Sequence, residues 1–306
     1  MNVSQRTAYG EELLDICKEN PNVVALDADL CGGTMSAVVE KGMPERFFEM
    51  GIGEQNMAGV AAGLALAGKI PYYHSFAVFA AGRPFEQIRQ SICLPNLPVK
   101  IVGASCGFSD FADGATHQCF EDVAIMRVLP RMTVFSPADA PEARKCARAA
   151  LALKGPAYIR INRNDIPVVT DAATPLEIGK PALMVDGKDV CICASGHMLY
   201  FALEARKILS GRGIDAKVLN FATIKPLDAA ALRAAIGSCP KVVAVEEHSI
   251  IGGLGAAIME ALGENPLPVR RVGIRDVYGE SSDDYIRLLE KYGLSAASIA
   301  DAAGWK

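Results

Sequence analysis

A carboxylate stands where the sequence predicts that a strand turns into a helix. The stretch FFEMGIGEQNM (47–57) reads as a buried strand, a glycine-bearing turn and the start of an apolar helix, with Glu54 at the junction. Burial among apolar groups disfavours the charged form of a carboxyl group, so we expect a raised pKa and proton transfer near neutral pH. The simpler interpretation is an acid at a helix N-terminus, stabilised by the dipole by about 0.3–1 kcal/mol.

A second candidate for chemistry is a histidine that follows a glycine turn. The segment FADGATHQ (111–118) contains Asp113 and His117, and the chain has only 4 histidines. Asp-Gly is common in turns for backbone reasons alone, and a single histidine is often structural. His117 therefore becomes a catalytic candidate only in the company of other functional groups.

The elements that must position these residues alternate between strand and helix along the whole chain. This alternation predicts an α/β fold, with parallel strands between layers of helices. We expect a first domain over 1–168, a linker over 169–183 and a smaller α/β domain over 184–306. Strands are predicted at 23–30, 99–104, 133–137, 157–163, 189–196, 216–226 and 241–247, and helices at 54–67, 141–153, 197–210, 228–236 and from about 254.

Composition excludes several classes of protein. A chain of 306 residues is long enough for two cores. Its net charge of −4 provides no basic field for nucleic acid or an anionic membrane. No apolar run approaches the roughly 18–20 residues of a membrane span, and no secretory signal pattern is present. The 9 cysteines are scattered without zinc-site spacing, which indicates reduced thiols and a cytoplasmic protein.

The order of the motifs resembles the pyrimidine-binding domain of transketolases, followed by their C-terminal domain. The resemblance covers essentially the whole chain, and deoxyxylulose-phosphate synthases and 2-oxoacid dehydrogenase β subunits share the domain pair. It implies a thiamine-diphosphate-binding pyrimidine domain with a parallel sheet flanked by helices. The motifs are ALDADL, FFEMGIGEQNMAGVAAGLALAG, SFAVFAAGRPFEQIRQ, DGATHQCFEDVAIMRVLPRMTVFSPAD, IRINRNDIP and VEEHSIIGGLGAAI.

The resemblance also implies a partner subunit. In this superfamily a separate domain binds the diphosphate through a metal ion, with a Gly-Asp-Gly motif that this sequence lacks. The chain is thus similar to the C-terminal section of a split transketolase. We expect the partner to ligate Mg²⁺ or Ca²⁺, and we expect this chain to be active only together with the partner. We further expect an α2β2 heterotetramer in which the small-residue helix 54–68 forms part of the interface.

The family's cofactor contacts can be carried over onto this sequence. Thiamine diphosphate supplies a nucleophilic thiazolium carbon and an electron sink for breaking carbon–carbon bonds. The resemblance implies that Glu54 bonds the N1′ nitrogen of its pyrimidine ring. Phe76 and Phe79 match stacking residues, although their spacing also fits the core face of a helix. Phe85 matches a recurrent aromatic residue, and Asp29 ends a strand near the cofactor.

Substrate contacts follow from the same resemblance. Asp113 and His117 match residues that contact sugar hydroxyls and the carbonyl region. Arg163 and Arg6 match arginines that bind the terminal phosphate, a task that suits the planar guanidinium. Ser105 stands where the family commonly has a histidine that binds phosphate.

The sequence departs from the family at three places. Ser105 replaces that histidine, Asp110-Phe111-Ala112 replaces a small–Gly–Glu run, and Gly33 falls where a serine is usual. Two explanations remain open. Either ordinary sugar phosphates of pentose-phosphate metabolism still bind, or the donor is a sulfonated or branched ketose.

The expected function is therefore transfer of a two-carbon ketol unit from a ketose phosphate to an aldose. One alternative is the β subunit of a 2-oxoacid dehydrogenase, although the Asp-Gly-x-Thr-His motif together with Arg163 favours phosphosugars. A second alternative is a non-enzymatic subunit that only assembles. Retention of Glu54, His117 and Arg163 in one chain argues against the second alternative.

Overall fold

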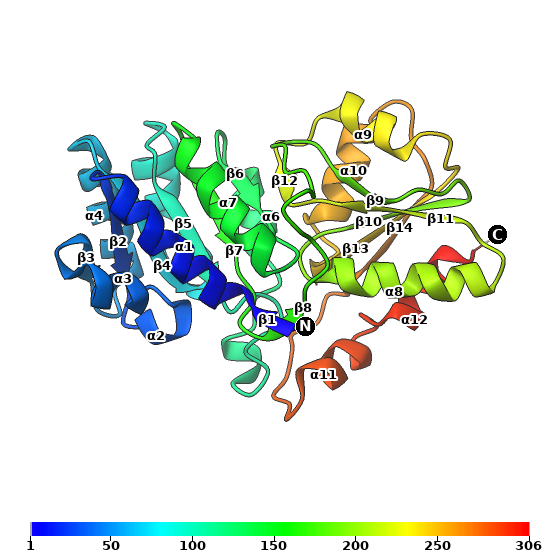
Figure 1. Cartoon of the computed structure of the whole chain (residues 1–306), viewed down its shortest axis with the longest axis horizontal. Coiled ribbons are helices and arrows are strands. Elements are labelled where there is room, and N and C mark those ends of the chain that lie inside the picture. The colour runs from blue at the N-terminus through cyan, green and yellow to red at the C-terminus, as the bar shows by residue number, and fades with distance from the viewer. Residues whose placement is uncertain (1, 306) are drawn as a thin grey trace.

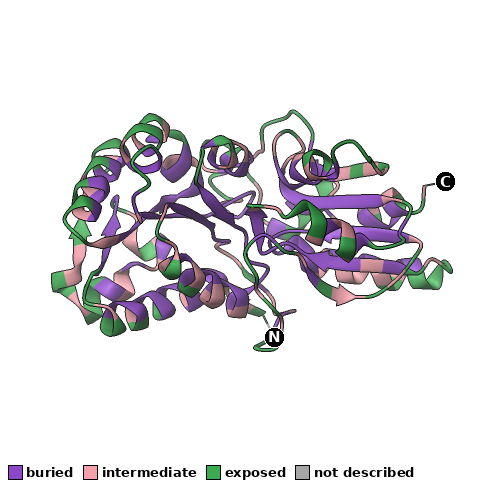
Figure 2. Cartoon of the chain, turned by 90° about the horizontal axis from the view of Figure 1, so that it is seen from above, coloured by how far each residue is buried: buried purple, intermediate pink, exposed green. Residues whose placement is uncertain are grey.

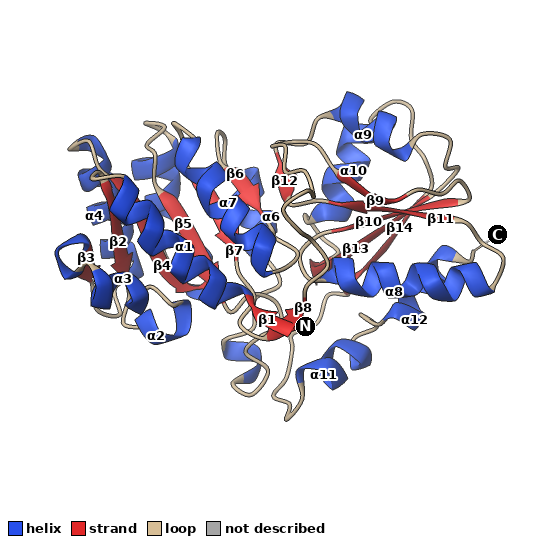
Figure 3. Cartoon of the chain, viewed as in Figure 1, coloured by secondary structure: helices blue, strands red, loops and turns tan. Residues whose placement is uncertain are grey.

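Two parallel-rich sheets lie side by side, one in each half of the molecule (Figure 1). The structure is a computed structural model, and it describes residues 2–305. Helices cover both faces of each sheet (Figure 3), which confirms the predicted α/β class.

The N-terminal half is built on a seven-stranded sheet in the order β12-β6-β7-β5-β4-β2-β3. All neighbouring strands are parallel except the pair β12 and β6. A separate antiparallel pair joins β1 to β8. The strands and α-helices of this half are β1 (Asn2–Ser4), α1 (Gln5–Glu19), β2 (Val23–Asp27), α2 (Cys31–Thr34), α3 (Ala37–Gly42), β3 (Phe47–Glu49), α4 (Glu54–Leu66), β4 (Ile70–Phe76), α5 (Phe85–Gln87), β5 (Lys100–Ala104), α6 (Asp122–Val128), β6 (Thr133–Phe135), α7 (Ala140–Ala152), β7 (Ala157–Arg160) and β8 (Asp165–Pro167).

The C-terminal half is built on a five-stranded sheet in the order β14-β13-β10-β11-β9, in which only β9 is antiparallel to its neighbour. Its elements are β9 (Ala182–Val185), β10 (Val190–Ala194), α8 (Met198–Gly211), β11 (Ala216–Asn220), β12 (Thr223–Lys225), α9 (Ala229–Ile236), β13 (Val242–Ser249), α10 (Leu254–Leu262), β14 (Val269–Ile274), α11 (Tyr285–Lys291) and α12 (Ala296–Ala303).

Each sheet is buried on both faces. In Figure 2 the strands are almost continuously buried, whereas the exposed residues lie on the outer surfaces of the helices and in loops. Residues of α1 and α7 form a core with one face of the first sheet. Residues of α4 and α6 form a core with its other face.

Two predicted strands differ in the structure. The predicted strand 216–226 divides into β11 and β12, and β12 pairs with β6 of the first sheet (Figure 1). The strand predicted at the start of FFEMGIGEQNM is present, but the prediction that it is buried is wrong. The strand β3 lies at the edge of the sheet with one neighbour, so Phe48 and Glu49 are exposed.

The carboxyl ends of β2, β3, β4, β5 and β7 point to one edge of the first sheet because these strands are parallel. Ligand sites of parallel sheets lie at such an edge. Most of the predicted site residues follow these strand ends directly. Within residues 2–305, no helix combines the length and the apolar character that crossing a bilayer requires.

Candidate active site

Glu54 is the first residue of α4 and lines an open cavity. The turn before it is fixed by the carboxylate of Glu49, which accepts hydrogen bonds from the backbone N–H groups of Gly51 (2.8 Å) and Asp29 (2.9 Å). Gly51 has a φ of 63°, in the left-handed region that favours glycine. The Glu54 side chain is only 4% exposed. The cavity of about 610 Å³ is lined by Ile52, Gly53, Glu54, Gln55, Asn56 and Arg83.

An ion pair that the sequence analysis did not predict accompanies Glu54. Nη1 of Arg83 lies 2.8 Å from Oε1 of Glu54. The guanidinium carbon of Arg83 lies 4.0 Å from the centre of the Phe79 ring. Glu54 is therefore buried beside a counter-charge rather than among apolar groups alone. Arg83 is within the motif SFAVFAAGRPFEQIRQ, but nothing in that pattern indicated which acid it would meet.

Three rings gather beside this ion pair. The rings of Phe76 and Phe79 are stacked, with 6.4 Å between centroids and 21° between planes. His117 meets both rings edge-on, at 6.4 Å from Phe76 and 5.4 Å from Phe79. Phe76 ends β4, and Phe79 follows in the helical segment Val78–Gly82. The structure thus brings together three of the predicted residues from segments about 40 positions apart.

Two arginines lie near Phe76 and Gly33. The guanidinium carbon of Arg163 is 5.9 Å from the Phe76 ring centre, and Nη1 of Arg163 forms an ion pair with Asp110. Nη1 of Arg6 donates to the carbonyl oxygen of Gly33 (3.0 Å). Burial, followed by the positive charge of Arg163, lowers the pKa of Arg6. Both arginines therefore contribute to one positively charged region, although Asp110 already partners one of them.

The departure at Gly33 has a packing consequence. A Cβ atom at position 33 would lie 2.7 Å from a carbon of the Phe76 ring. A serine at this position, which the resemblance led us to expect, would require the Phe76 ring to move. Gly33 and the present position of Phe76 are therefore coupled.

Among the described residues, no hydrogen bond, ion pair or ring contact joins the other predicted residues to this group. Asp29 and Asp113 are exposed, and Phe85 packs partly buried against the core that α4 and α6 form with the sheet. Ser105 is fully buried with a φ of 54°, and its Oγ atom has no hydrogen-bond partner among the described residues. The structure leaves the roles of these four residues as predictions.

Sequence reasoning missed a buried acid near the same edge. Asp27, the last residue of β2, accepts hydrogen bonds from the Thr34 hydroxyl (2.6 Å), the Ser36 hydroxyl (2.8 Å) and the Leu30 N–H (2.6 Å). Burial raises the pKa of Asp27 to about 6. The motif DADL offered both aspartates, and only the tertiary structure distinguishes the buried Asp27 from the exposed Asp29.

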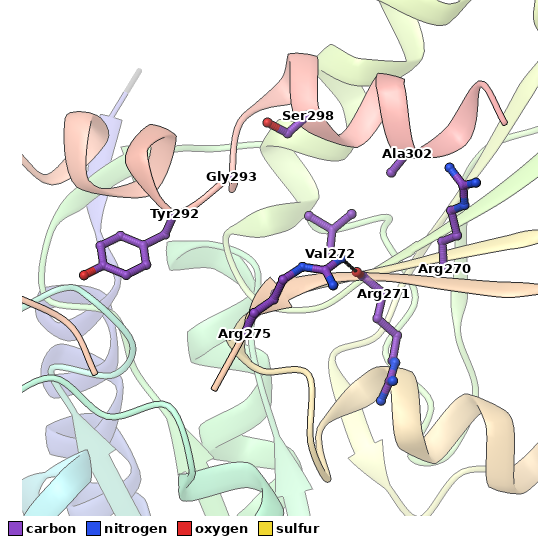
Figure 4. A pocket seen from close by; sticks show the side chains of 9 residues that line it. Arg270, Arg271, Val272, Arg275, Tyr292, Gly293, Ser298 and Ala302 are labelled. Carbon is purple, nitrogen blue, oxygen red and sulfur yellow. Dashed lines mark hydrogen bonds between the residues drawn. The ribbon is translucent and has the colours of Figure 1, made fainter. Parts of the chain in front are cut away.

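A second cationic region lies far from Glu54, in the C-terminal half (Figure 4). Its pocket of about 370 Å³ has three arginines that do not converge. Arg270 lies over the Trp305 ring at 4.5 Å, and Arg271 points away and donates to the Ile250 carbonyl oxygen at 2.8 Å. Arg275 donates to the carbonyl oxygen of Arg271 at 3.5 Å, so we assign no anion site here. Among residues 2–305, no group of three or more histidine, cysteine, aspartate or glutamate side chains could hold a metal ion.

Comparison with known families identifies the two halves. Residues 1–168 match the transketolase pyrimidine-binding domain, and residues 179–299 match the transketolase C-terminal domain. The chain belongs to the transketolase family. This finding confirms the predicted resemblance. Transketolases depend on thiamine diphosphate, the cofactor implied above.

The chain is similar over nearly its whole length to sections and subunits of transketolases. A putative transketolase C-terminal section of Methanocaldococcus jannaschii is 44% identical and covers 96% of this chain and 93% of the relative. A 6-deoxy-6-sulfo-D-fructose transketolase subunit of Clostridium sp. is 43% identical, with coverage of 97% and 92%. One subunit of the apulose-4-phosphate transketolase of Phocaeicola vulgatus is 35% identical, with coverage of 98% and 96%.

A solved structure has the same arrangement. A split-gene transketolase in an inactive β4 tetramer is 48% identical to this chain, with a TM-score of 0.91 and coverage of 98% of this chain and 97% of that chain. The chain therefore corresponds to the C-terminal section of transketolases, and the predicted resemblance to a split transketolase is confirmed.

Proposed function

We propose that this chain supplies the pyrimidine-binding half of a thiamine-diphosphate-dependent transketolase. The complete enzyme would move a two-carbon ketol unit from a ketose phosphate to an aldose. The observation that carries the proposal is the arrangement at one sheet edge of a buried carboxyl group (Glu54), a stacked aromatic pair (Phe76 and Phe79) and two arginines (Arg6 and Arg163).

The residues around Glu54 fit the aminopyrimidine end of the cofactor. A carboxyl group is a suitable hydrogen-bond partner for a ring nitrogen, and the phenylalanine rings offer faces for stacking. When bound, thiamine diphosphate supplies the nucleophilic carbon and the electron sink for breaking the bond beside a ketose carbonyl. Glu54 would hold a proton at the ring nitrogen, and Phe76 and Phe79 would orient the ring. Phe85 and Asp29 would support this site.

The substrate would extend from the aromatic pair toward the arginines. His117, at the edge of both phenylalanine rings, would bond the carbonyl region of the sugar, and Asp113 would bond a hydroxyl group. Arg163 and Arg6 would bind the terminal anion through charge-assisted hydrogen bonds. Ser105, which lies in the same loop as His117, would also contact the substrate.

Two classes of ketose are candidates for the donor substrate. Phosphorylated ketoses of pentose-phosphate metabolism require only an anion site, which Arg6 and Arg163 provide. The ion pair between Asp110 and Arg163, together with Gly33 and Ser105, favours a donor whose anion or branching differs. Similarity to subunits of a sulfofructose transketolase and of an apulose-4-phosphate transketolase supports this second class.

We further propose that a partner subunit with a Gly-Asp-Gly motif binds the diphosphate and its Mg²⁺ or Ca²⁺, in a cytoplasmic α2β2 heterotetramer. Relatives named as sections or subunits support the division of the enzyme. The outer face of α4 provides a surface for assembly, because Gly59 and Gly63 are exposed there and nothing lies within 4 Å of an added Cβ. The nine cysteines are all free thiols, in keeping with a reducing compartment.

The test is ketol transfer by this chain co-expressed with a subunit that carries the Gly-Asp-Gly motif. A donor panel should contain phosphorylated, sulfonated and unmodified ketoses, with Glu54→Gln as the control. Activity with sugar phosphates selects the first donor class, and activity only with another ketose selects the second. Oxidation of 2-oxoacids instead of ketol transfer, or failure of the pair to bind thiamine diphosphate, would contradict the proposal.

A further inference from the structure

The candidate substrate residues share one loop that the C-terminal half holds in place. Residues 105–120 (the donor loop) connect β5 to α6 and contain Ser105, Asp110, Asp113 and His117. Phe120 accepts a backbone hydrogen bond from Ser249 (2.8 Å), and Phe111 accepts one from Ser282 (2.8 Å). The donor loop is therefore bonded at several points to segments more than 100 residues away in the sequence.

Glu247, on β13, makes the central contact. Its Oε1 atom accepts the backbone N–H of Phe108 at 2.7 Å and the hydroxyl of Tyr285 at 3.1 Å. The side chain is 1% exposed. A buried carboxyl group is costly unless it is hydrogen-bonded, so these two donors fix its position and the position of the loop backbone.

The hydroxyl group of Tyr285 also connects Glu247 to the segment that contains Arg163. Tyr285 accepts a hydrogen bond from Nδ2 of Asn162 at 2.8 Å, and Asn162 directly precedes Arg163. Glu247 therefore connects the loop that contains His117 with the segment after β7 that contains Arg163. These are the two groups proposed to contact opposite ends of the substrate.

Residues of the C-terminal half also pack closely against two glycines of the donor loop. Gly107 has a φ of 60°, and a Cβ atom there would overlap the carboxyl group of Glu247. Gly114 has a φ of 77°, and a Cβ atom there would overlap Ser281. Nε2 of Gln118 donates to the carbonyl oxygen of Glu280 at 2.9 Å.

We infer that the C-terminal domain positions the substrate-binding residues of the pyrimidine-binding domain, and that Glu247 is the positioning residue. Through Phe108 and through Tyr285 and Asn162, Glu247 fixes the distance between His117 and Arg163. The inference rests on the proposed function, since it assigns these two groups to the substrate. Among the described residues, no hydrogen bond or ion pair joins Glu247 to Glu54, Phe76 or Phe79, so it should affect substrate binding without affecting cofactor binding.

A neighbouring glutamate provides a matched control. Glu246 lies on the same strand and is equally buried, but it accepts the N–H groups of Leu254 (2.6 Å) and Gly255 (2.9 Å) at the start of α10. It therefore supports the C-terminal half without touching the donor loop. Loss of either carboxylate should lower stability, whereas only Glu247 should affect the substrate.

The experiment measures the KM for the donor, kcat and the affinity for thiamine diphosphate in the reconstituted complex. We expect Glu247→Ala to raise the donor KM about ten-fold, the scale of one lost charge-assisted hydrogen bond, with cofactor affinity unchanged. Glu247→Gln keeps an acceptor for Phe108 and should restore the donor KM. Glu246→Ala should leave it at the wild-type value. Equal donor KM values for Glu247→Ala and Glu246→Ala would overturn the inference.

Hydrogen exchange of the isolated chain separates this inference from the proposed function. Glu247→Ala should accelerate amide exchange across 105–120, and Glu246→Ala should not. If the wild-type complex lacks ketol transfer, the proposed function fails, and unchanged exchange in 105–120 would reject the positioning contact as well. If Glu247→Ala does not fold, Tyr285→Phe removes the link to Asn162 and should give the same changes at smaller size.

Discussion

Arg83 engages Glu54 and covers Phe79 at the same time. Its Nη1 atom is 2.8 Å from Oε1 of Glu54, and its guanidinium carbon is 4.0 Å from the Phe79 ring centre. An aromatic ring that stacked on this face of Phe79 would displace the guanidinium group. Arg83 can move toward solvent because it is 48% exposed, whereas Glu54 is held in place at the start of α4.

Replacement of Glu54 by glutamine should leave the fold intact and reduce turnover by about 10²–10⁴-fold, the usual contribution of a positioned acid or base. The amide keeps the shape of the side chain but cannot exchange a proton with a ring nitrogen. Ketol transfer in the reconstituted complex and thermal unfolding of the isolated chain check both statements. Glu86→Gln is a matched control, since Glu86 also pairs with an arginine (Arg89, 2.8 Å) but on the surface. Near-normal activity of Glu54→Gln would contradict the assignment.

Replacement of Phe79 by leucine should weaken the affinity for thiamine diphosphate about ten-fold. Leucine keeps most of the apolar volume and loses the ring face, which is worth about 0.5–1.5 kcal/mol in aromatic pairs. Titration of cofactor into the reconstituted complex measures the effect. Phe201→Leu, at a partly buried phenylalanine in α8, serves as the control and should leave the affinity unchanged.

Replacement of Asp110 by asparagine should lower the KM for phosphorylated or sulfonated donors several-fold. The change removes the carboxylate that pairs with Arg163, so the guanidinium group becomes free for the anion of the substrate. Arg163→Lys should have the opposite effect, because lysine lacks the planar donor fork. An unmodified ketose is the control substrate. A change in its KM equal to the change for the anionic donor would argue against competition for Arg163.

Two substitutions at Gly63 should separate folding from assembly. Gly63 is exposed in the interior of α4, with open space around an added Cβ. Gly63→Ala should raise the free energy of unfolding of the isolated chain by about 0.5–1 kcal/mol through helix propensity. Gly63→Leu should fold equally well but weaken association with the partner subunit, as measured by light scattering. Unimpaired assembly of Gly63→Leu would place the interface elsewhere.

The pH dependence of stability should report on Glu247. Burial is the main cause that raises its pKa from 4.5 to about 7, and the positive charge of Arg160 opposes this rise. The folded state then binds the proton more tightly than the unfolded state. The contribution of Glu247 to the free energy of unfolding is therefore full below pH 4.5 and is lost as the pH rises through about 7.

Glu247→Gln cannot titrate and should remove this component. Relative to Glu247→Gln, the wild-type chain should lose on the order of 3 kcal/mol between about pH 4.5 and about pH 8, measured by denaturant unfolding. His197 faces the same carboxyl group, but burial lowers its pKa to about 3, so it stays neutral in this range. Asp122, Arg160, Tyr285 and the Cys106 thiol, whose pKa burial raises, are the other ionisable groups around Glu247. Parallel pH profiles for the two proteins would contradict the assignment.

The sequence alone determined the fold class, the family and most of the residues at the site edge. Alternating strand and helix patterns reflect burial of both sheet faces, which is a local property of each segment. The motif around Glu54 and the Asp-Gly-x-Thr-His segment are contiguous, so they can be read without a structure. The strand β4 was missed because Tyr72, Tyr73 and His74 look polar, and only the fold provides hydrogen-bond partners for them at Ala147, Ala80, Leu26 and Tyr9.

Only the tertiary structure decided which polar groups meet. Arg83 with Glu54, Asp110 with Arg163 and Glu247 with Phe108 are separated by 29, 53 and 139 positions, respectively. No periodicity links such residues, because their approach depends on strand order and on the packing of one domain against the other. The pairing of β12 with the first sheet has the same origin, since β6 would be an edge strand without β12 and the two meet only when the halves of the chain pack together.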